Sequence, residues 1–174
     1  MPNDVIYIGM KPTKLVLDYI ATHLTYDPTT GTISKKYGKS FGTLHGGYMT
    51  IQLILDTKYE GCALHYFTRA HQVAWYITYG VWPDMFIDHI DGNKANNRLS
   101  NLRLATCSQN TCNQKKSKRK TTSQYKGVYR RGNRWGAYCN NKRIGSFSTE
   151  AEAAIAYNTK AVELYGEYAC LNVI

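Results

Sequence analysis

The spacing of hydrophobic residues in the first half of the chain changes from an alternating to a helical period. Over residues 32–64, short apolar–polar alternations are separated by glycine- and lysine-rich turns, which predicts antiparallel strands. Apolar residues then recur at helical spacing over residues 68–79, and Gly80 marks the stop. An earlier helix is predicted over residues 15–24, with a buried face formed by Leu15, Leu17, Ile20 and Leu24.

The C-terminal part of the chain predicts three strands and one helix. The strands are expected at residues 125–131, 134–139 and 142–147, with turns at Gly132-Asn133 and Asn140-Asn141. Thr149 and Glu152 form a capping box at the helix start, and Gly166 ends the helical pattern. The predicted buried face consists of Ala151, Ala154, Ile155 and Val162.

The middle of the chain predicts two strands joined by a polar loop. An apolar run at residues 85–87 leads into Asp88 and His89, and a loop rich in glycine and asparagine follows. Residues 101–106 predict a second strand, so the chain turns back on itself.

A capping box at Thr106 and Gln109 predicts that a helix follows, with Asn110 in its first turn. Asp88 offers a carboxylate oxygen and Asn110 an amide oxygen, both suited to Mg²⁺, which keeps several waters and also binds phosphate oxygens. We therefore expect one ion, Mg²⁺ or Mn²⁺, held by Asp88 and Asn110.

His89 is the candidate general base for hydrolysis of a phosphodiester bond. If the strand alternates regularly, its ring lies on the opposite side from Asp88. A neutral imidazole can deprotonate an attacking water while the ion stabilises the leaving oxygen. One ring nitrogen needs an acceptor, for which the amide or backbone carbonyl of Asn101 is the candidate. The alternative is structural, because Asp-Gly and Asn-Asn pairs are ordinary turn sequences.

The pattern resembles HNH endonucleases of the homing and phage type over roughly residues 65–114. The residues that carry the resemblance are Asp88-His89, Asp91-Gly92-Asn93, Asn96-Asn97, Asn101-Leu102-Arg103, Thr106 and Gln109-Asn110. It implies a ββα-metal core in which His89 is the general base, Asn101 orients it, and Asp88 and Asn110 are the metal ligands. Asn110 stands where many members of the family have a last histidine.

Charge is unevenly distributed along this chain of net charge +10. No acidic residue occurs between Asp91 and Glu150, an interval that contains fourteen lysines and arginines. Excluding acids favours binding to a phosphate backbone, because each neutralised phosphate releases counterions. Double-stranded DNA is therefore the expected partner, with Arg103, Lys115 and Lys116 among the contacts; the basic stretch alone also fits RNA. Residues 115–124 are predicted to be a basic linker, either disordered or ordered along DNA.

The tail resembles the DNA-binding domain of plant ethylene-response factors of the Apetala class. The matching residues are Tyr125-Lys126-Gly127-Val128, Trp135-Gly136-Ala137, Ile144-Gly145-Ser146-Phe147, the alanine-rich run at 150–157 and Leu171-Asn172. The resemblance implies that the sheet contacts DNA through Lys126, Tyr129, Arg131, Arg134, Tyr138, Asn140 and Arg143. Several of these differ in type from the plant residues, so the plant target sequence does not carry over.

Together these patterns predict an α+β protein with two modules. An N-terminal extension (1–16) precedes an HNH nuclease module with an N-terminal antiparallel sheet (17–114), the linker (115–124) and a DNA-binding domain of three strands and a helix (125–174). The expected function is metal-dependent, site-preferring cleavage of duplex DNA of the homing type. The main alternative is a non-catalytic, sequence-specific DNA-binding regulator that retains a remnant nuclease fold.

Two further expectations concern the setting. The sequence has no apolar run of about eighteen residues and no signal-peptide pattern, which predicts a soluble, intracellular protein, cytoplasmic in the host if a phage encodes it. The five cysteines, including Cys62, are scattered and are expected to be reduced rather than zinc-bound. A monomer is favoured over an oligomer, and no membrane contact is expected.

Overall fold

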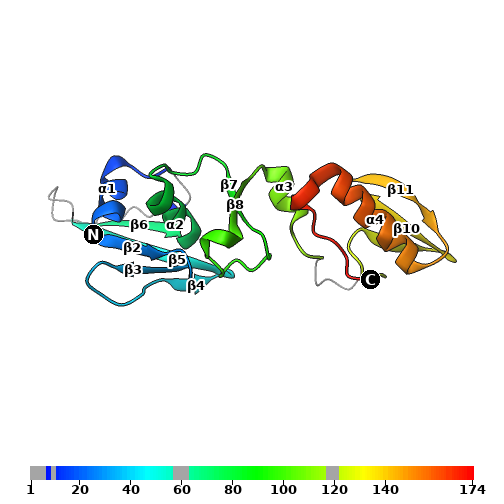
Figure 1. Ribbon diagram of the computed structural model, residues 1–174, viewed down its shortest axis with the longest axis horizontal. Coiled ribbons are helices and arrows are strands. Elements are labelled where there is room, and N and C mark those ends of the chain that lie inside the picture. The colour runs from blue at the N-terminus through cyan, green and yellow to red at the C-terminus, as the bar shows by residue number, and fades with distance from the viewer. Residues whose placement is uncertain (1–6, 9–10, 57–62, 117–121) are drawn as a thin grey trace, which may run out of the picture. The chain divides into compact units, whose positions relative to one another are not determined.

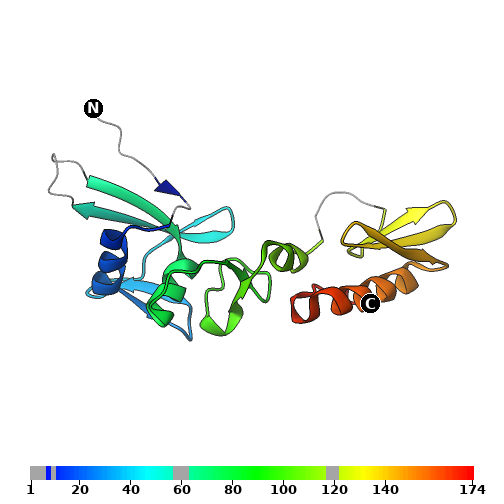
Figure 2. The same cartoon turned by 90° about the horizontal axis from the view of Figure 1, so that it is seen from above.

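The computed structural model describes residues 7–8, 11–56, 63–116 and 122–174. The chain divides into two compact units, Met1–Leu104 and Ala105–Ile174, and mixes small sheets with helices (Figures 1 and 2). The expected boundary at residue 114 lies within the second of these units. Cys62 and residues 117–121 of the expected linker lie outside the described residues.

The first unit contains three sheets. Its elements are β1 (Tyr7–Ile8), α1 (Lys14–His23), β2 (Leu24–Asp27), β3 (Thr32–Lys35), β4 (Thr43–His45), β5 (Tyr48–Asp56), β6 (Ala63–Arg69), α2 (Ala70–Tyr79), β7 (Phe86–His89), the 3₁₀ helix η1 (Leu99–Asn101) and β8 (Leu102–Ala105). The strand orders are β1-β6-β5-β4, β2-β3 and β7-β8. The antiparallel sheet expected over residues 32–64 is confirmed for β4 and β5, but it was wrong for β3, which pairs with β2 in a separate hairpin. Outside that range, β1 runs parallel to β6.

Alternation along β5 separates a core face from an outer face. Ile51 and Leu53 are buried in a core cluster that also contains Val16, Ile20 and Val73 from the two helices. The intervening side chains of β5, including Tyr48 and Thr50, belong to the opposite, outer face. α1 and α2 contribute residues to the core on the first face, and at the start of β5 the outer face also meets α2, where Tyr48 lies against His71.

The helices of the first unit differ in detail from the sequence prediction. α2 begins at Ala70 because β6 continues to Arg69, and Gly80 ends it in the left-handed conformation with a φ of 73°. On α1 the buried residues are Val16 and Ile20, whereas Leu15 is 50% exposed. The predicted buried face was therefore wrong for Leu15, because the neighbouring elements decide which of several apolar positions is covered.

The second unit contains α3 (Cys107–Cys112), β9 (Val128–Arg131), β10 (Arg134–Cys139), β11 (Lys142–Phe147), α4 (Glu150–Tyr165) and η2 (Gly166–Tyr168). The three strands form one antiparallel sheet, and α4 lies along one of its faces (Figure 1). The predicted turn at Asn140-Asn141 is confirmed: both residues have positive φ, 52° and 57°, as a tight hairpin turn requires. The capping box of Thr149 and Glu152 is also confirmed.

The buried face of α4 was only partly predicted. Its buried residues are Ala153, Ala154, Tyr157 and Ala161. Ile155 and Val162, which were expected inside, are 54% and 48% exposed. Small alanines let the helix approach the sheet closely, so they take the core positions instead of the larger aliphatic residues. Over the described ranges, none of the helices has the length and apolar character needed to cross a bilayer.

Candidate active site

The candidate site lies at the end of β7, where a short strand delivers two polar side chains into the protein. Asp88 and His89 are only 3% and 5% exposed. Burying an acid and an imidazole is costly unless each finds polar partners. Those partners come from the loop that follows β7 and from β8.

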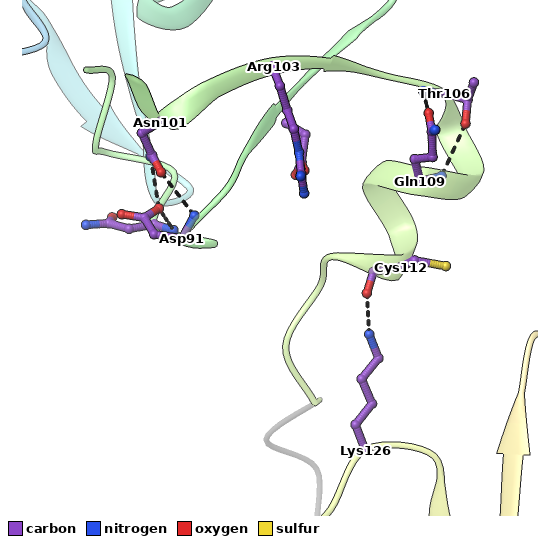
Figure 3. A network of polar contacts seen from close by, with 9 residues as sticks. Asp91, Asn101, Arg103, Thr106, Gln109, Cys112 and Lys126 are labelled. Carbon is purple, nitrogen blue, oxygen red and sulfur yellow. Dashed lines mark hydrogen bonds and ion pairs between the residues drawn. The ribbon is translucent and has the colours of Figure 1, made fainter. Parts of the chain in front are cut away.

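The loop after β7 is held together by Asn101 (Figure 3). The side-chain oxygen of Asn101 accepts a hydrogen bond from the Asp91 backbone N–H at 3.0 Å, and its amide nitrogen donates to Asp91 Oδ1 at 3.0 Å and to the Asn96 carbonyl at 2.8 Å. The Asn101 carbonyl accepts from the Ile90 N–H at 2.9 Å. Burial raises the pKa of Asp91, but hydrogen bonds from Asn96, Asn93 and Asn101 outweigh burial and hold it below its usual range. Asn101 thus closes the loop between β7 and β8.

The His89 ring is held by a residue that the sequence analysis missed. His89 Nε2 lies 3.1 Å from Asn97 Oδ1, so an asparagine of the loop supplies the acceptor assigned to Asn101. Burial lowers the pKa of His89, which the Asn97 contact and the charges of Asp91 and Asp88 oppose, and Lys94 lowers it further. The imidazole is therefore neutral at neutral pH, the form that a general base needs.

A hairpin far away in the sequence supports Asn97. The Tyr26 hydroxyl of β2 donates to the Asn97 carbonyl at 2.7 Å, and Arg98 Nε donates to the Thr29 carbonyl at 2.9 Å. Gly31 lies at the β2–β3 turn with a φ of 76° and packs against the backbone of Asn97 and Arg98. A Cβ added at Gly31 would lie 2.5 Å from the Arg98 backbone nitrogen, so only glycine fits there. The hairpin therefore fixes the loop segment that orients His89. The Thr30-Gly31 turn was visible in the sequence, but nothing indicated what it contacts.

Two aromatic rings of the first unit surround His89. The ring centroid of His71 lies 5.1 Å from that of His89, in an edge-to-face arrangement of 87°. The Tyr48 centroid lies 5.6 Å from His71 and 6.1 Å from His89. Burial, together with His89 and Arg69, lowers the pKa of His71 to about 3, so this ring is neutral packing around the site. His65, the other histidine of this region, instead contacts the Gln52 amide at 2.9 Å.

Asp88 is paired with Arg103, an arginine that was predicted from the sequence to contact DNA. The nitrogens Nε and Nη2 of Arg103 lie 3.0 Å and 2.9 Å from Asp88 Oδ2. Side-chain exposure is 12% for Arg103 and 4% for Asp88. The pair stabilises the ionised carboxylate in a buried position. In turn, the carboxylate neutralises part of the positive charge of Arg103 inside the protein.

Asn110 lies in the first turn of a helix, as predicted. Gln109 N donates to Thr106 Oγ1 at 3.2 Å and Thr106 N donates to Gln109 Oε1 at 2.8 Å, which confirms the capping box (Figure 3). Asn110 is in the first turn of α3. Asp88 belongs to the first unit and Asn110 to the second.

The proposed ligands fit Mg²⁺ by their chemistry. Asp88 is an ionised carboxylate at a strand end, and Asn110 is a partly buried amide at a helix start. Hard oxygen donors of this kind suit Mg²⁺, which completes its shell with water and phosphate oxygens and does not need a full protein cage.

Several residues expected to contact DNA share one face of the C-terminal sheet, opposite α4. Ala137 and Cys139 of β10 are buried, whereas the alternating residues Arg134 and Tyr138 are exposed. The Tyr129 and Tyr138 rings stack at 5.0 Å. Exposed or half-buried members of this sheet face are Tyr129, Arg131, Arg134, Tyr138 and Arg143. Their side chains form a basic and aromatic surface, and Asn140 lies at its edge in the β10–β11 turn.

Lys126 has a different environment. Its ammonium donates to the Cys112 carbonyl at 2.5 Å (Figure 3). It also donates to the Gln114 carbonyl at 2.7 Å. Cys112 is the last residue of α3, so the lysine donates a hydrogen bond to a backbone carbonyl at the helix end. Its positive charge also interacts favourably with the negative end of the helix dipole.

A Lys126→Met variant should therefore lose stability rather than a phosphate contact. We expect a loss of about 1–2 kcal/mol in the free energy of unfolding, since hydrogen bonds from charged groups are lost while the stem is kept. Chemical denaturation measures this, with Lys142→Met on the exposed start of β11 as the control. Unchanged stability together with a weaker salt dependence of DNA binding would instead make Lys126 a phosphate contact.

Comparison with known proteins identifies the class of domain at this site. Residues 68–112 match the family model described as HNH endonuclease. The match runs from the end of β6 to the end of α3 and includes Asp88, His89, Asn101 and Asn110. This segment of the chain is therefore similar to HNH endonucleases.

Three relatives extend the similarity. The chain is 43% identical over 96 residues, 52% of its length and 49% of the relative, to "Uncharacterized HNH endonuclease L560" of Acanthamoeba polyphaga mimivirus. It is 38% identical over 77 residues, 44% of its length and 42% of the relative, to "SPbeta prophage-derived putative HNH homing endonuclease YosQ" of Bacillus subtilis strain 168. It is 44% identical over 61 residues, 34% of its length and 50% of the relative, to "Protein 3.8" of Escherichia phage T7. The chain thus spans about half the length of these relatives.

Proposed function

We propose that the protein is a metal-dependent endonuclease that hydrolyses phosphodiester bonds in duplex DNA. The observation that carries the proposal is the buried imidazole of His89, held 3.1 Å from Asn97 Oδ1 inside a segment that matches HNH endonucleases. In this role His89 takes a proton from the attacking water.

The metal would be held by Asp88, and Asn110 is proposed as the second ligand on the strength of its spacing in the sequence. When bound, a divalent ion polarises the phosphate and stabilises the leaving oxygen. Asn101 does not contact the His89 ring in this role; it positions the ring indirectly, because it closes the loop that carries Asn97. The metal is Mg²⁺, with Mn²⁺ as the natural substitute, since both prefer oxygen ligands.

The C-terminal sheet is proposed to bind duplex DNA in the manner of the ethylene-response-factor domains. Support comes from the exposed face that carries Tyr129, Arg131, Arg134, Tyr138 and Arg143, while α4 covers the other face. Lys115 and Lys116, at the start of the basic linker, add charge to the same unit. Binding by a separate surface raises the effective concentration of the nuclease at its site, which favours site-preferring cleavage of the homing type.

Metal removal tests the enzymatic function. Supercoiled plasmid incubated with the protein and Mg²⁺ should be nicked or linearised, EDTA should stop the reaction, and added Mn²⁺ should restore it. The readout is the conversion of supercoiled to open or linear DNA on a gel. Cleavage that continues in EDTA would contradict the metal role.

One observation favours a second function. Because Arg103 occupies Asp88 Oδ2, the buried pair is also what a purely structural site would contain. The protein would then be a DNA-binding regulator with a remnant nuclease fold. Tight plasmid binding without cleavage in either metal would select this alternative.

A further inference from the structure

Two cations share one aromatic ring next to the candidate base. The guanidinium carbon of Arg69 lies 4.2 Å from the Tyr48 ring centroid, and the Lys94 ammonium lies 4.6 Å from it. The three residues come from separate segments: Tyr48 begins β5, Arg69 ends β6, and Lys94 belongs to the loop after β7. This cluster, Tyr48, Arg69 and Lys94, lies within the first unit.

Strand register explains why the cluster forms at this place. Arg69 is directly opposite Thr50 in the β5–β6 pair, so its side chain shares a sheet face with Thr50 and Tyr48. This is the outer face, because Ile51 and Leu53 fill the core on the other side. The Lys94 stem lies beside the Gly46-Gly47 turn that precedes Tyr48, since a Cβ added at Gly47 would be in ordinary contact with Lys94 Cδ at 3.9 Å.

The positive charges of this cluster are not balanced by carboxylates in the described part of the protein. Among the described ion pairs, neither Arg69 nor Lys94 is joined to a carboxylate. Arg69 Nη1 and Thr50 Oγ1 are enclosed, and neither has a hydrogen-bond partner in the described structure. An aromatic face attracts cations only weakly, and two cations near the same ring repel each other. An anion held between them would relieve the repulsion.

The cluster is also one ring away from the candidate base. The Tyr48 ring centroid lies 6.1 Å from that of His89. The positive charge of Lys94 is near enough to contribute to the lowered pKa of His89. Phosphates of one DNA strand follow each other by about 3.4 Å along the helix axis. A phosphate over Tyr48 would therefore belong to the same short stretch of strand as the phosphodiester that is attacked by the water that His89 deprotonates. Lys94 is exposed and Arg69 is partly exposed, so DNA can reach both.

We propose that Arg69 and Lys94, stacked on Tyr48, bind a backbone phosphodiester of the strand that is cut. This inference rests on the proposed function. It assigns the two cations to positioning of the DNA strand beside His89, and it assigns Tyr48 to holding both cations in place. The guanidinium presents several donors in a fixed plane, whereas the ammonium contributes a mobile point charge.

The test uses the full chain with His89→Ala, so that DNA stays intact during binding measurements. Lys94→Gln and Arg69→Gln are each added, and affinity for a duplex is measured by fluorescence anisotropy at several salt concentrations. Each change should lower the slope of log K against log salt by about 0.9, the value for one lost phosphate contact. Arg69→Lys keeps the charge and should keep most of the slope. Lys14→Gln on α1, which covers the core face, is the matched control and should leave the slope unchanged.

Slopes equal to that of the parent in both glutamine variants would overturn the proposal. Lys94 is exposed in a loop, so its variant is expected to fold, and thermal unfolding confirms this for each protein. In the proteins with His89 intact, Lys94→Gln should also reduce cleavage at low DNA concentration by about tenfold, as expected for one lost charged contact. Because the binding measurement requires no cleavage, failure of the nuclease proposal and failure of the phosphate proposal give different results.

Discussion

Replacing His89 with alanine should lower the rate of DNA cleavage by about 10²–10⁴-fold, the usual contribution of a positioned general base. The imidazole is buried, neutral and held by Asn97, so it is prepared to accept a proton from water. Affinity for DNA should change little, because a neutral side chain does not neutralise a phosphate. Single-turnover cleavage of a labelled duplex gives the rate, and anisotropy gives the affinity.

The matched control for this variant is His23→Ala. His23 is exposed at the end of α1, where it stacks on Tyr19 at 4.3 Å, and should contribute nothing to cleavage. Full cleavage activity in His89→Ala would refute the base assignment. A loss of activity accompanied by unfolding would be recognised by circular dichroism, and Asn97→Ala, which removes the acceptor but keeps the imidazole, then provides the second test.

Removing the arginines from the exposed face of the C-terminal sheet should have the second large effect. We expect the triple variant Arg131→Gln, Arg134→Gln and Arg143→Gln to lower the salt slope of DNA binding by roughly 2 to 3, about 0.9 for each phosphate contact. Affinity should fall most at low salt, where counterion release contributes most. The measurement is a series of binding curves across salt concentrations with the full chain.

Arg130 offers a control on the same strand. Its guanidinium lies 5.4 Å from the Trp135 ring and its Nε donates to the Gly132 carbonyl at 3.1 Å, so it packs within the unit. Arg130→Gln should therefore keep the salt slope. If the triple variant binds like the parent protein, the sheet is not the DNA anchor, and the basic residues of other segments become the candidates.

Local elements were largely predictable from the sequence. The capping box at Thr106 and Gln109 and the turn at Asn140-Asn141 depend on residues within three positions of each other, so their signals survive without knowledge of the fold. Helix faces were less predictable. Ile155 is exposed although it is apolar, because Ala153 and Ala154 let α4 lie closer to the sheet.

The candidate site was predictable in its composition but not in its contacts. The adjacent Asp88 and His89, followed by an asparagine-rich loop, were evident in the sequence and belong to the segment that matches HNH endonucleases. The sequence did not indicate that Asn97, rather than Asn101, reaches His89 Nε2, because both asparagines lie in the segment that connects β7 to β8. It also assigned Arg103 to DNA, whereas the structure pairs it with Asp88.

The sequence by itself determined the strands and helix of the C-terminal sheet, the excess of positive charge from residue 92 to residue 149, and the residue types of the candidate site. Tertiary structure alone decided which residues meet. Tyr26 supports Asn97 across 71 positions of the chain, and Tyr48 brings Arg69 and Lys94 together from two distant segments. The physical reason is that capping and turn formation act over a few residues. Contacts between distant segments instead depend on how sheets and helices pack, which no local pattern records.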